Sequence, residues 1–191
     1  MGRWEPNAPG RLSRAAMELY LERGFDQTTV ADIAERAGLT ERTFFRHFTD
    51  KREVLFGNQQ ILHDIITNAI AEADDSASPI AAMGAGLEAV AELIGQRRDF
   101  AQQRQSVIAA NPALQERELT KLAALAASSA QALRLRGVPE PTAGLTAEAG
   151  IAVFKIAYTT WAESPPDRSL VEFIRDTLAE LEAVATGTAV Q

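Results

Sequence analysis

The chain lacks several residue types on which whole classes of function depend. It has no cysteine, which excludes disulfides, thiol nucleophiles and thiolate metal sites. Its two histidines are too few to argue for a metal site, so we expect no metal and no cofactor. No apolar run approaches the roughly 20 residues that span a membrane, and no signal peptide is recognisable. We therefore predict a cytoplasmic protein without a membrane segment.

Catalytic signatures are also missing. The sequence contains no HExxH, no GxSxG and no phosphate-cradling glycine loop. His63 and Asp64 are adjacent, but neighbouring residues of a helix diverge and do not form a dyad. We therefore predict that the protein is not an enzyme.

The composition favours a helical protein with an uneven charge distribution. Hydrophobic residues make up 46% of the 191 residues, which is enough for a sizeable core. The net charge is −7, but residues 1–56 contain 9 basic and 9 acidic residues. The remaining residues contain 10 basic and 17 acidic ones, so the whole acidic excess lies there. A neutral first region is compatible with local binding of a polyanion, because the local field matters more than the total.

The stretch 28–53 carries the most information. Thr29 is placed to cap a helix in a capping-box-like pair with an acid three residues on. Gly38 is able to take the left-handed conformation that ends this helix. Thr40 then caps a second short helix over 41–48. A helix, a glycine turn and a capped short helix form the pattern of a helix-turn-helix.

The second short helix has the side chains of a DNA-reading helix. Phe44 and Phe48 are four residues apart and face inward, so the side chains of Arg42, Thr43, Phe45, Arg46 and His47 lie outside or along the edges. Such a helix fits the major groove, where its first residues meet base edges. We expect Arg42 to read guanine, and Thr40 and Thr43 to contact bases or phosphate. Lys51, at the start of the next predicted helix, is expected to bind phosphate.

The run GFDQTTVADIAERAGLTERTFFRHFTDKREVLF, residues 24–56, resembles the DNA-binding domain of tetracycline-repressor (TetR) type regulators. The resemblance implies that the following residues lie at the DNA: Thr29, Thr40, Arg42, Thr43, Phe45, Arg46, His47 and Lys51. Phe45 departs from the pattern, since many members carry a tyrosine there whose hydroxyl meets a phosphate. A phenylalanine cannot make that hydrogen bond.

Apolar periodicity predicts an all-α protein of about nine helices. A three-helix DNA-binding domain over residues 1–50 precedes a helical domain over 51–191. The helices outside the central stretch are expected at about 10–23, 51–73, 79–97, 99–110, 112–136, 146–163 and 167–186. The helix over 51–73 starts at the DNA and ends in the second domain, which would make it the link between the two.

The resemblance also implies an effector pocket between helices of the second domain. The candidates are the larger side chains of its central helices: Met83, Leu87, Phe100, Arg104, Ile108, Leu122, Phe154, Tyr158 and Trp161. For each of them, a place in the plain core is favoured over a contact with a ligand. Tyr158 and Trp161 carry polar groups that could orient a ligand, and Arg104 could meet an anion. The apolar lining favours a small lipophilic or aromatic compound.

The last two predicted helices have apolar faces that could fold back on the domain or pair with a second copy. Pairing would give a four-helix bundle, and the family resemblance favours it. The interface candidates are Val153, Ala157, Leu170, Phe173, Ile174, Thr177, Leu178 and Leu181.

We therefore predict a homodimeric repressor that binds a palindromic operator and is released by a small-molecule effector. Two alternatives stay open. One is a constitutive regulator or activator without a ligand. The other is a helical interaction or ligand-carrier protein with a vestigial helix-turn-helix, against which the exposed cations argue. Arg42→Ala is expected to relax sequence preference, and Lys51→Ala to weaken binding to all sequences alike.

Overall fold

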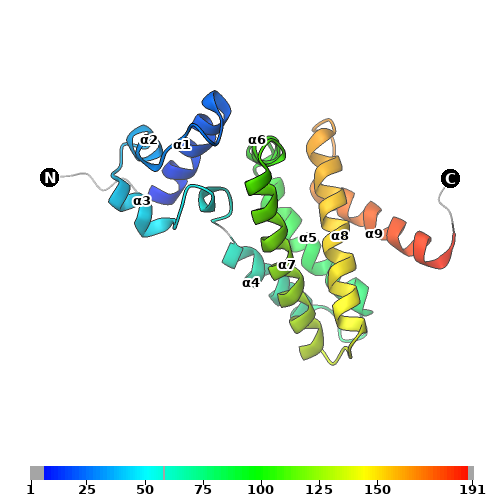
Figure 1. The fold of residues 1–191 in the computed structure, drawn as a ribbon. Coiled ribbons are helices and arrows are strands. Elements are labelled where there is room, and N and C mark those ends of the chain that lie inside the picture. Colours follow the sequence, from blue (N-terminus) through cyan, green and yellow to red (C-terminus); the bar gives the residue numbers. More distant parts are fainter. Residues whose placement is uncertain (1–6, 58, 189–191) are drawn as a thin grey trace. The chain divides into compact units, whose positions relative to one another are not determined.

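The computed structural model describes residues 7–57 and 59–188, and all regular secondary structure within these ranges is helical. The helices of this part (Figure 1) are α1 (Ala8–Arg23), α2 (Val30–Arg36), α3 (Glu41–His47), the short 3-10 helix η1 (Glu53–Leu55), α4 (Gln59–Glu72), α5 (Pro79–Gly95), α6 (Arg98–Ala109), α7 (Pro112–Leu135), α8 (Thr142–Glu163) and α9 (Leu170–Thr186). The predicted all-α class is confirmed. No described helix is long and apolar enough to cross a bilayer.

The helices form two compact units. Unit 1 consists of the described part of Met1–Asn58 together with Gln103–Glu118, and unit 2 of Gln59–Gln102 and the described part of Leu119–Gln191. Both α6 and α7 therefore contribute residues to both units. The predicted domain division after residue 50 did not include the corner formed by the end of α6 and the start of α7 in the first unit.

The core of unit 1 is small and apolar. Many of its buried side chains lie in or directly after α1, α2, α3 and η1: Leu12, Ala16, Leu19, Ile33, Ala34, Phe44, Phe48, Val54, Leu55 and Phe56. The α6 and α7 segments of this unit add the buried Val107, Ile108 and Leu114. Helix α1 begins at Ala8, two residues before the predicted start, because the Asn7 side chain accepts a hydrogen bond from the Gly10 N–H and caps it. Residues 1–6 lie outside the described part.

The expected helix over residues 51–73 begins later than predicted. The Asp50 carboxylate accepts the N–H groups of Arg52 and Glu53 at 2.7 and 3.1 Å, which sets a tight turn. The next apolar residues, 54–56, are all buried. Three successive residues of an α-helix spread over about 200°, so they could not all face one core. The 3-10 turn η1 resolves this conflict, and α4 starts only at Gln59.

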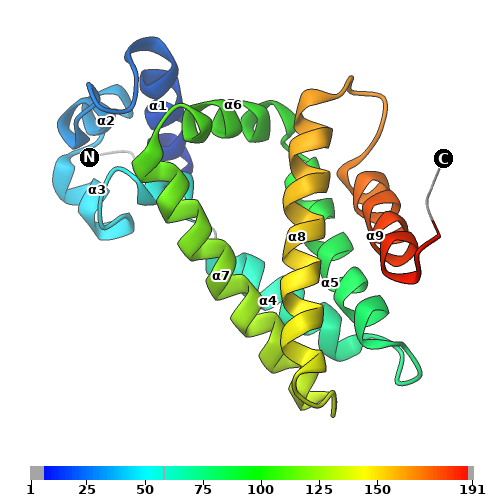
Figure 2. The same ribbon diagram turned by 45° about the vertical axis from the view of Figure 1, so that its right-hand side comes forward.

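Unit 2 is built around α5, which packs against α4, α8 and α9 (Figure 2). Its sequence is apolar on nearly every side, as expected of a central helix. Gly86 permits the close approach of α4, because a Cβ there would come within 2.8 Å of the Ile66 side chain. The core of this unit therefore rests on small residues as well as large ones.

The last two helices begin at other residues than predicted, and local hydrogen bonds explain both starts. Helix α8 begins at Thr142, and the Glu140 carboxylate accepts the N–H of Gly144 in its first turn. Helix α9 begins at Leu170, after a capping box in which Ser169 and Glu172 exchange hydrogen bonds. This Ser-x-x-Glu signal is present in the sequence and would have placed the start of α9 three residues later than 167.

Candidate nucleic-acid interface

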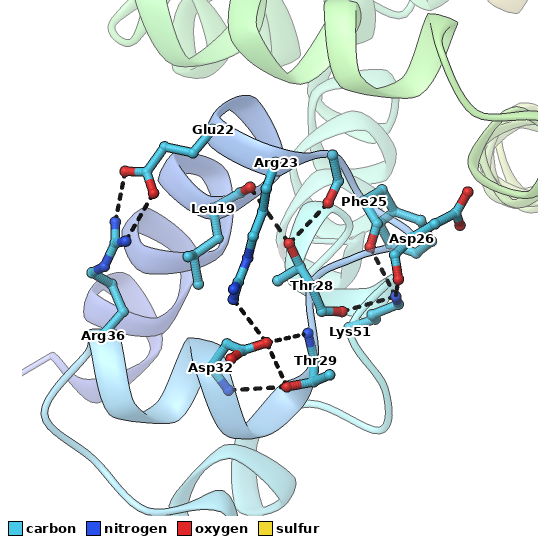
Figure 3. A network of polar contacts seen from close by, with 11 residues as sticks. Leu19, Glu22, Arg23, Phe25, Asp26, Thr28, Thr29, Asp32, Arg36 and Lys51 are labelled. Carbon is cyan, nitrogen blue, oxygen red and sulfur yellow. Dashed lines mark hydrogen bonds and ion pairs between the residues drawn. The ribbon is translucent and has the colours of Figure 1, made fainter.

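Helix α2 is fixed by the predicted cap. The Thr29 hydroxyl accepts the Asp32 N–H at 3.2 Å and donates to the Asp32 carboxylate at 2.6 Å, while the Thr29 N–H donates to the same carboxylate at 2.8 Å (Figure 3). Arg23 of α1 adds an ion pair at 2.7 Å. The hydrogen bonds from Thr29, together with Arg23, lower the pKa of Asp32 to about 2. The capping box is confirmed. Its hydrogen bonds to Asp32 use the Thr29 hydroxyl within the protein.

The turn between α2 and α3 needs its glycine. Gly38 has φ +64°, and the N–H groups of Gly38 and Leu39 close on the carbonyls of Glu35 and Ala34. These two bonds form a Schellman motif. Arg11 of α1 donates to the Ala37 carbonyl at 2.5 Å and so ties the turn to α1. The angle between the two short helices is thus set by backbone contacts.

Helix α3 presents one buried and one exposed side. Thr40 caps it by accepting the Thr43 N–H at 3.2 Å. Phe44 and Phe48 are buried, as predicted. Among the remaining candidates on this helix and its cap, Thr43 is half-buried. The others are exposed: Thr40, Arg42, Phe45, Arg46 and His47. The structure therefore brings six of the eight predicted DNA-contacting residues together on α3 and its cap.

Lys51 lies in a different environment from the one expected. Its ammonium donates to the carbonyls of Phe25, Asp26 and Thr28 at 2.8, 3.3 and 2.9 Å and lies 4.3 Å from the centre of the Phe25 ring (Figure 3). The buried Tyr20 hydroxyl donates to the Lys51 carbonyl at 2.6 Å. An ammonium has three N–H donors, so none is left for phosphate in this arrangement. Lys51 holds the loop that precedes the α2 cap.

We expect Lys51→Met to destabilise unit 1 without changing the electrostatics of DNA binding. Methionine keeps the stem but leaves three carbonyls without a charged donor, which should lower the free energy of unfolding by about 2 kcal/mol. Denaturant titration measures this loss, and Arg52→Met, an exposed neighbour, is the control. A stable variant whose salt dependence of DNA binding falls by about one charge per copy would instead establish a phosphate contact.

Ion pairs within unit 1 occupy most of its acidic side chains. Arg36 binds Glu22 through two hydrogen bonds of 2.8 Å and also reaches Glu18, and this pairing lowers the pKa of Glu22. Arg52 pairs with Asp50 at 2.9 Å. In the described part of the chain, neither Arg42 nor Arg46 has an acidic partner. Both arginines of the helix predicted to read DNA therefore remain available.

The corner of α6 and α7 is a part of unit 1 that the sequence did not reveal. Arg104 donates to the Leu55 carbonyl and to Glu118, each at 2.9 Å, and lies over the Phe56 ring. Arg117 pairs with Glu53. Arg104 is thus engaged in holding η1, where the prediction placed it at a ligand. No local pattern signals these pairs, since their partners lie 14 to 64 residues away.

The predicted effector-binding residues are divided between the two units. Arg104 and Ile108 belong to unit 1, and the others to unit 2. Met83, Leu87 and Trp161 are fully buried in the core of unit 2. Tyr158 donates from its hydroxyl to the Ala101 carbonyl at 3.0 Å. A surface cleft of about 740 Å³ lies between the end of α5 and the start of α9, and Trp161 alone of the candidates lines it.

The predicted dimer residues divide into two groups. Four of them are buried within the chain's own core: Val153, Ala157, Leu170 and Ile174. These four offer no surface to a second copy. The other four, Phe173, Thr177, Leu178 and Leu181, are half-buried on α9.

Comparison with known proteins agrees with this geometry. Residues 12–56 match the bacterial regulatory proteins of the tetR family. The HTH-type transcriptional regulator TcmR of Streptomyces glaucescens is 34% identical over 105 residues, which cover 49% of this chain and 45% of TcmR. TtgR of Pseudomonas putida is 34% identical over 76 residues, 38% of this chain and 36% of TtgR. The chain thus spans less than half the length of these curated relatives.

Solved structures resemble the chain over nearly its whole length. FadR of Thermus thermophilus, a TetR-family repressor crystallised with lauroyl-CoA, has 23% identity and a TM-score of 0.56 over 96% of each chain. FadR of Bacillus subtilis, crystallised with stearoyl-CoA, has 18% identity and a TM-score of 0.62 over 90% of this chain and 96% of that one. At this identity the likeness concerns the fold.

The capped pair α2–α3, its glycine turn and its exposed cations define unit 1 as a helix-turn-helix domain of the DNA-binding class. The chain has the DNA-binding domain and the fold of the tetR family of bacterial regulatory proteins. The predicted family resemblance is confirmed.

Proposed function

We propose that the chain is a transcriptional repressor that binds a two-fold symmetric operator as a homodimer and leaves it when a small molecule binds unit 2. The observation that carries the DNA-binding part is the outer side of α3. It presents Arg42 and Arg46 without acidic partners among the described residues. Arg42 lies in the first turn, where a recognition helix meets base edges.

The roles of the α3 side chains follow from their chemistry. An arginine in the first turn is suited to the O6 and N7 atoms of guanine. Arg46 and His47, which lie 3.4 Å apart at the other end, are suited to phosphate. The hydroxyls of Thr40 and Thr43 form a hydrogen bond with one another at 3.1 Å. This bond uses one proton and one lone pair, so the remaining proton and lone pairs can bond to DNA. Base contacts specify the site and phosphate contacts position the domain.

Dimerisation is supported by an apolar stripe on α8. The stripe consists of the exposed residues Leu145, Ala152 and Ile156 and the half-buried Ala149, which recur at i, i+4, i+7 and i+11. Ile156 is 59% exposed. Helix α9 adds the half-buried residues of its own stripe. Two such helices from each of two copies would build a four-helix bundle, and the operator half-sites would then follow the two-fold axis.

Release requires that the effector bind one arrangement of the dimer better than the other. Two helices could link the effector site to the DNA-binding unit, since α6 and α7 contribute residues to both units. Their shared corner holds η1 through Arg104 and Arg117. A shift of either helix in unit 2 would therefore act on contacts within the DNA-binding unit. Acyl-CoA thioesters, which two structural neighbours hold, are the first effectors to test.

The test is binding of the purified protein to the DNA that flanks its own gene and to a random duplex, across a range of salt concentrations. We expect affinity for the specific site to exceed that for random DNA by about 10³-fold or more. Lauroyl-CoA and stearoyl-CoA are then added to the operator complex. Equal, weak binding to all DNA, including pools selected from random sequence, would contradict the proposed function. Operator binding that no added compound alters would favour a constitutive regulator.

A further inference from the structure

Phe45 is an exposed aromatic side chain in the middle of the polar side of α3. It is 55% exposed. Arg42 precedes it by three residues, so these two side chains are neighbours on the helix surface, whereas the side chain of Arg46, the next residue, diverges by about 100°. Every other exposed side chain of this helix carries a charge or a titratable ring.

Contact with a buried aromatic residue fixes the orientation of the Phe45 ring. Phe45 packs edge-on against Phe44, with ring centres 5.4 Å apart and an interplanar angle of 81°. Phe44 is fully buried and in turn contacts Phe48. Edge-to-face packing is the favoured geometry of aromatic pairs. The packed aromatic residues beneath it therefore hold the exposed Phe45 ring in one orientation.

The chemistry of a phenyl ring limits what it can recognise in DNA. Phe45 has neither a donor for phosphate nor an acceptor for a base amino group. Among the base edges of the major groove, the 5-methyl group of thymine is the apolar feature, and phenylalanine is one of the side chains that contact it. Because Phe45 neighbours Arg42 on the same side of α3, engagement of Arg42 in the major groove would bring the ring against such an edge.

We propose that Phe45 is a specificity-determining residue that reads the 5-methyl group of one thymine in each operator half-site. This inference rests on the proposed function and deepens it, because it names a chemical group that the operator must carry. Packing of the ring on a deoxyribose is the competing arrangement.

Replacement of thymine by deoxyuridine tests the proposal, because it removes the methyl group and leaves base pairing unchanged. Each thymine of the selected operator is replaced in turn, symmetrically in both half-sites. At one position we expect affinity to fall about four-fold per methyl group, hence about fifteen-fold for the pair. Phe45→Ala should bind the thymine and deoxyuridine operators equally well. The ratio of two affinities of one variant does not depend on its folded fraction.

Leu21→Ala is the matched control, since Leu21 is an exposed apolar residue of the same unit that lies on α1. It should keep the full methyl dependence. The proposal is overturned if specific binding exists but no thymine shows the effect, as expected for contact with sugar, or if the effect persists in Phe45→Ala. Absence of any specific DNA binding would instead show up with unmodified operator and would contradict the proposed function itself.

Discussion

Ile156→Glu is expected to convert the dimer into a monomer and to lower operator affinity about 100-fold or more. The substitution places a carboxylate in the middle of the α8 stripe. Burial of an unpaired charge against an apolar partner costs several kcal/mol, and the two-fold axis imposes this cost twice. A monomer would keep one recognition helix, so it would lose the gain from engaging two half-sites at once.

Leu135→Glu is the control for this substitution. Leu135 is 81% exposed at the end of α7 and does not belong to the stripe, so the same change in chemistry should leave a dimer. Sedimentation velocity and operator titration at the same protein concentration measure both variants. A dimeric Ile156→Glu variant with full operator affinity would show that α8 is not the interface.

The parts of the fold that the sequence predicted well depend on contacts between near neighbours. The α2 cap joins Thr29 to a residue three positions away, and the turn depends on one glycine with positive φ. Phe44 and Phe48 faced inward as predicted because helical spacing puts them on one side. Such features are written in a few consecutive residues, so one sequence is enough to find them.

The features that the sequence did not reveal depend on distant partners. Lys51 satisfies carbonyls 23 to 26 residues earlier in the chain. Arg117 reaches Glu53, 64 residues away. A lysine beside a recognition helix could bind either DNA phosphate or carbonyls of its own chain. Only the position of the loop carbonyls distinguishes these two roles. The same limit applies to Val153 and Ala157, since periodicity gives an apolar face and not the partner that covers it.

The ion pairs explain how a domain without net positive charge can present a cationic surface. Arg36 and Arg23 neutralise acids of α1 and α2, and Arg52 neutralises Asp50. Arginine suits these structural roles because its fork binds a carboxylate through two bonds. The arginines of α3 therefore give a local excess of positive charge. The count of charged residues over 1–56 does not reveal this excess. Phosphate responds to that local field.

Arg42→Ala is expected to remove base discrimination at one position in each half-site. Loss of a bidentate contact to guanine costs about 1–3 kcal/mol per half-site, so the dimer should lose about 2–6 kcal/mol at its operator. Affinity for random DNA should change far less. A set of operators with every base pair at each position, titrated at one salt concentration, identifies the position whose preference disappears.

Arg46→Ala and Arg14→Ala separate this role from general electrostatics. Arg46 is expected to contact phosphate, so its loss should weaken specific and random DNA alike and reduce the salt dependence by about one charge per copy. Arg14 is an exposed arginine of α1, and its removal should leave base preference intact. If Arg42→Ala weakened all sequences equally, as we expect of Arg46→Ala, Arg42 would be a phosphate contact. The base-reading residue would then have to be sought among Thr40, Thr43 and Phe45.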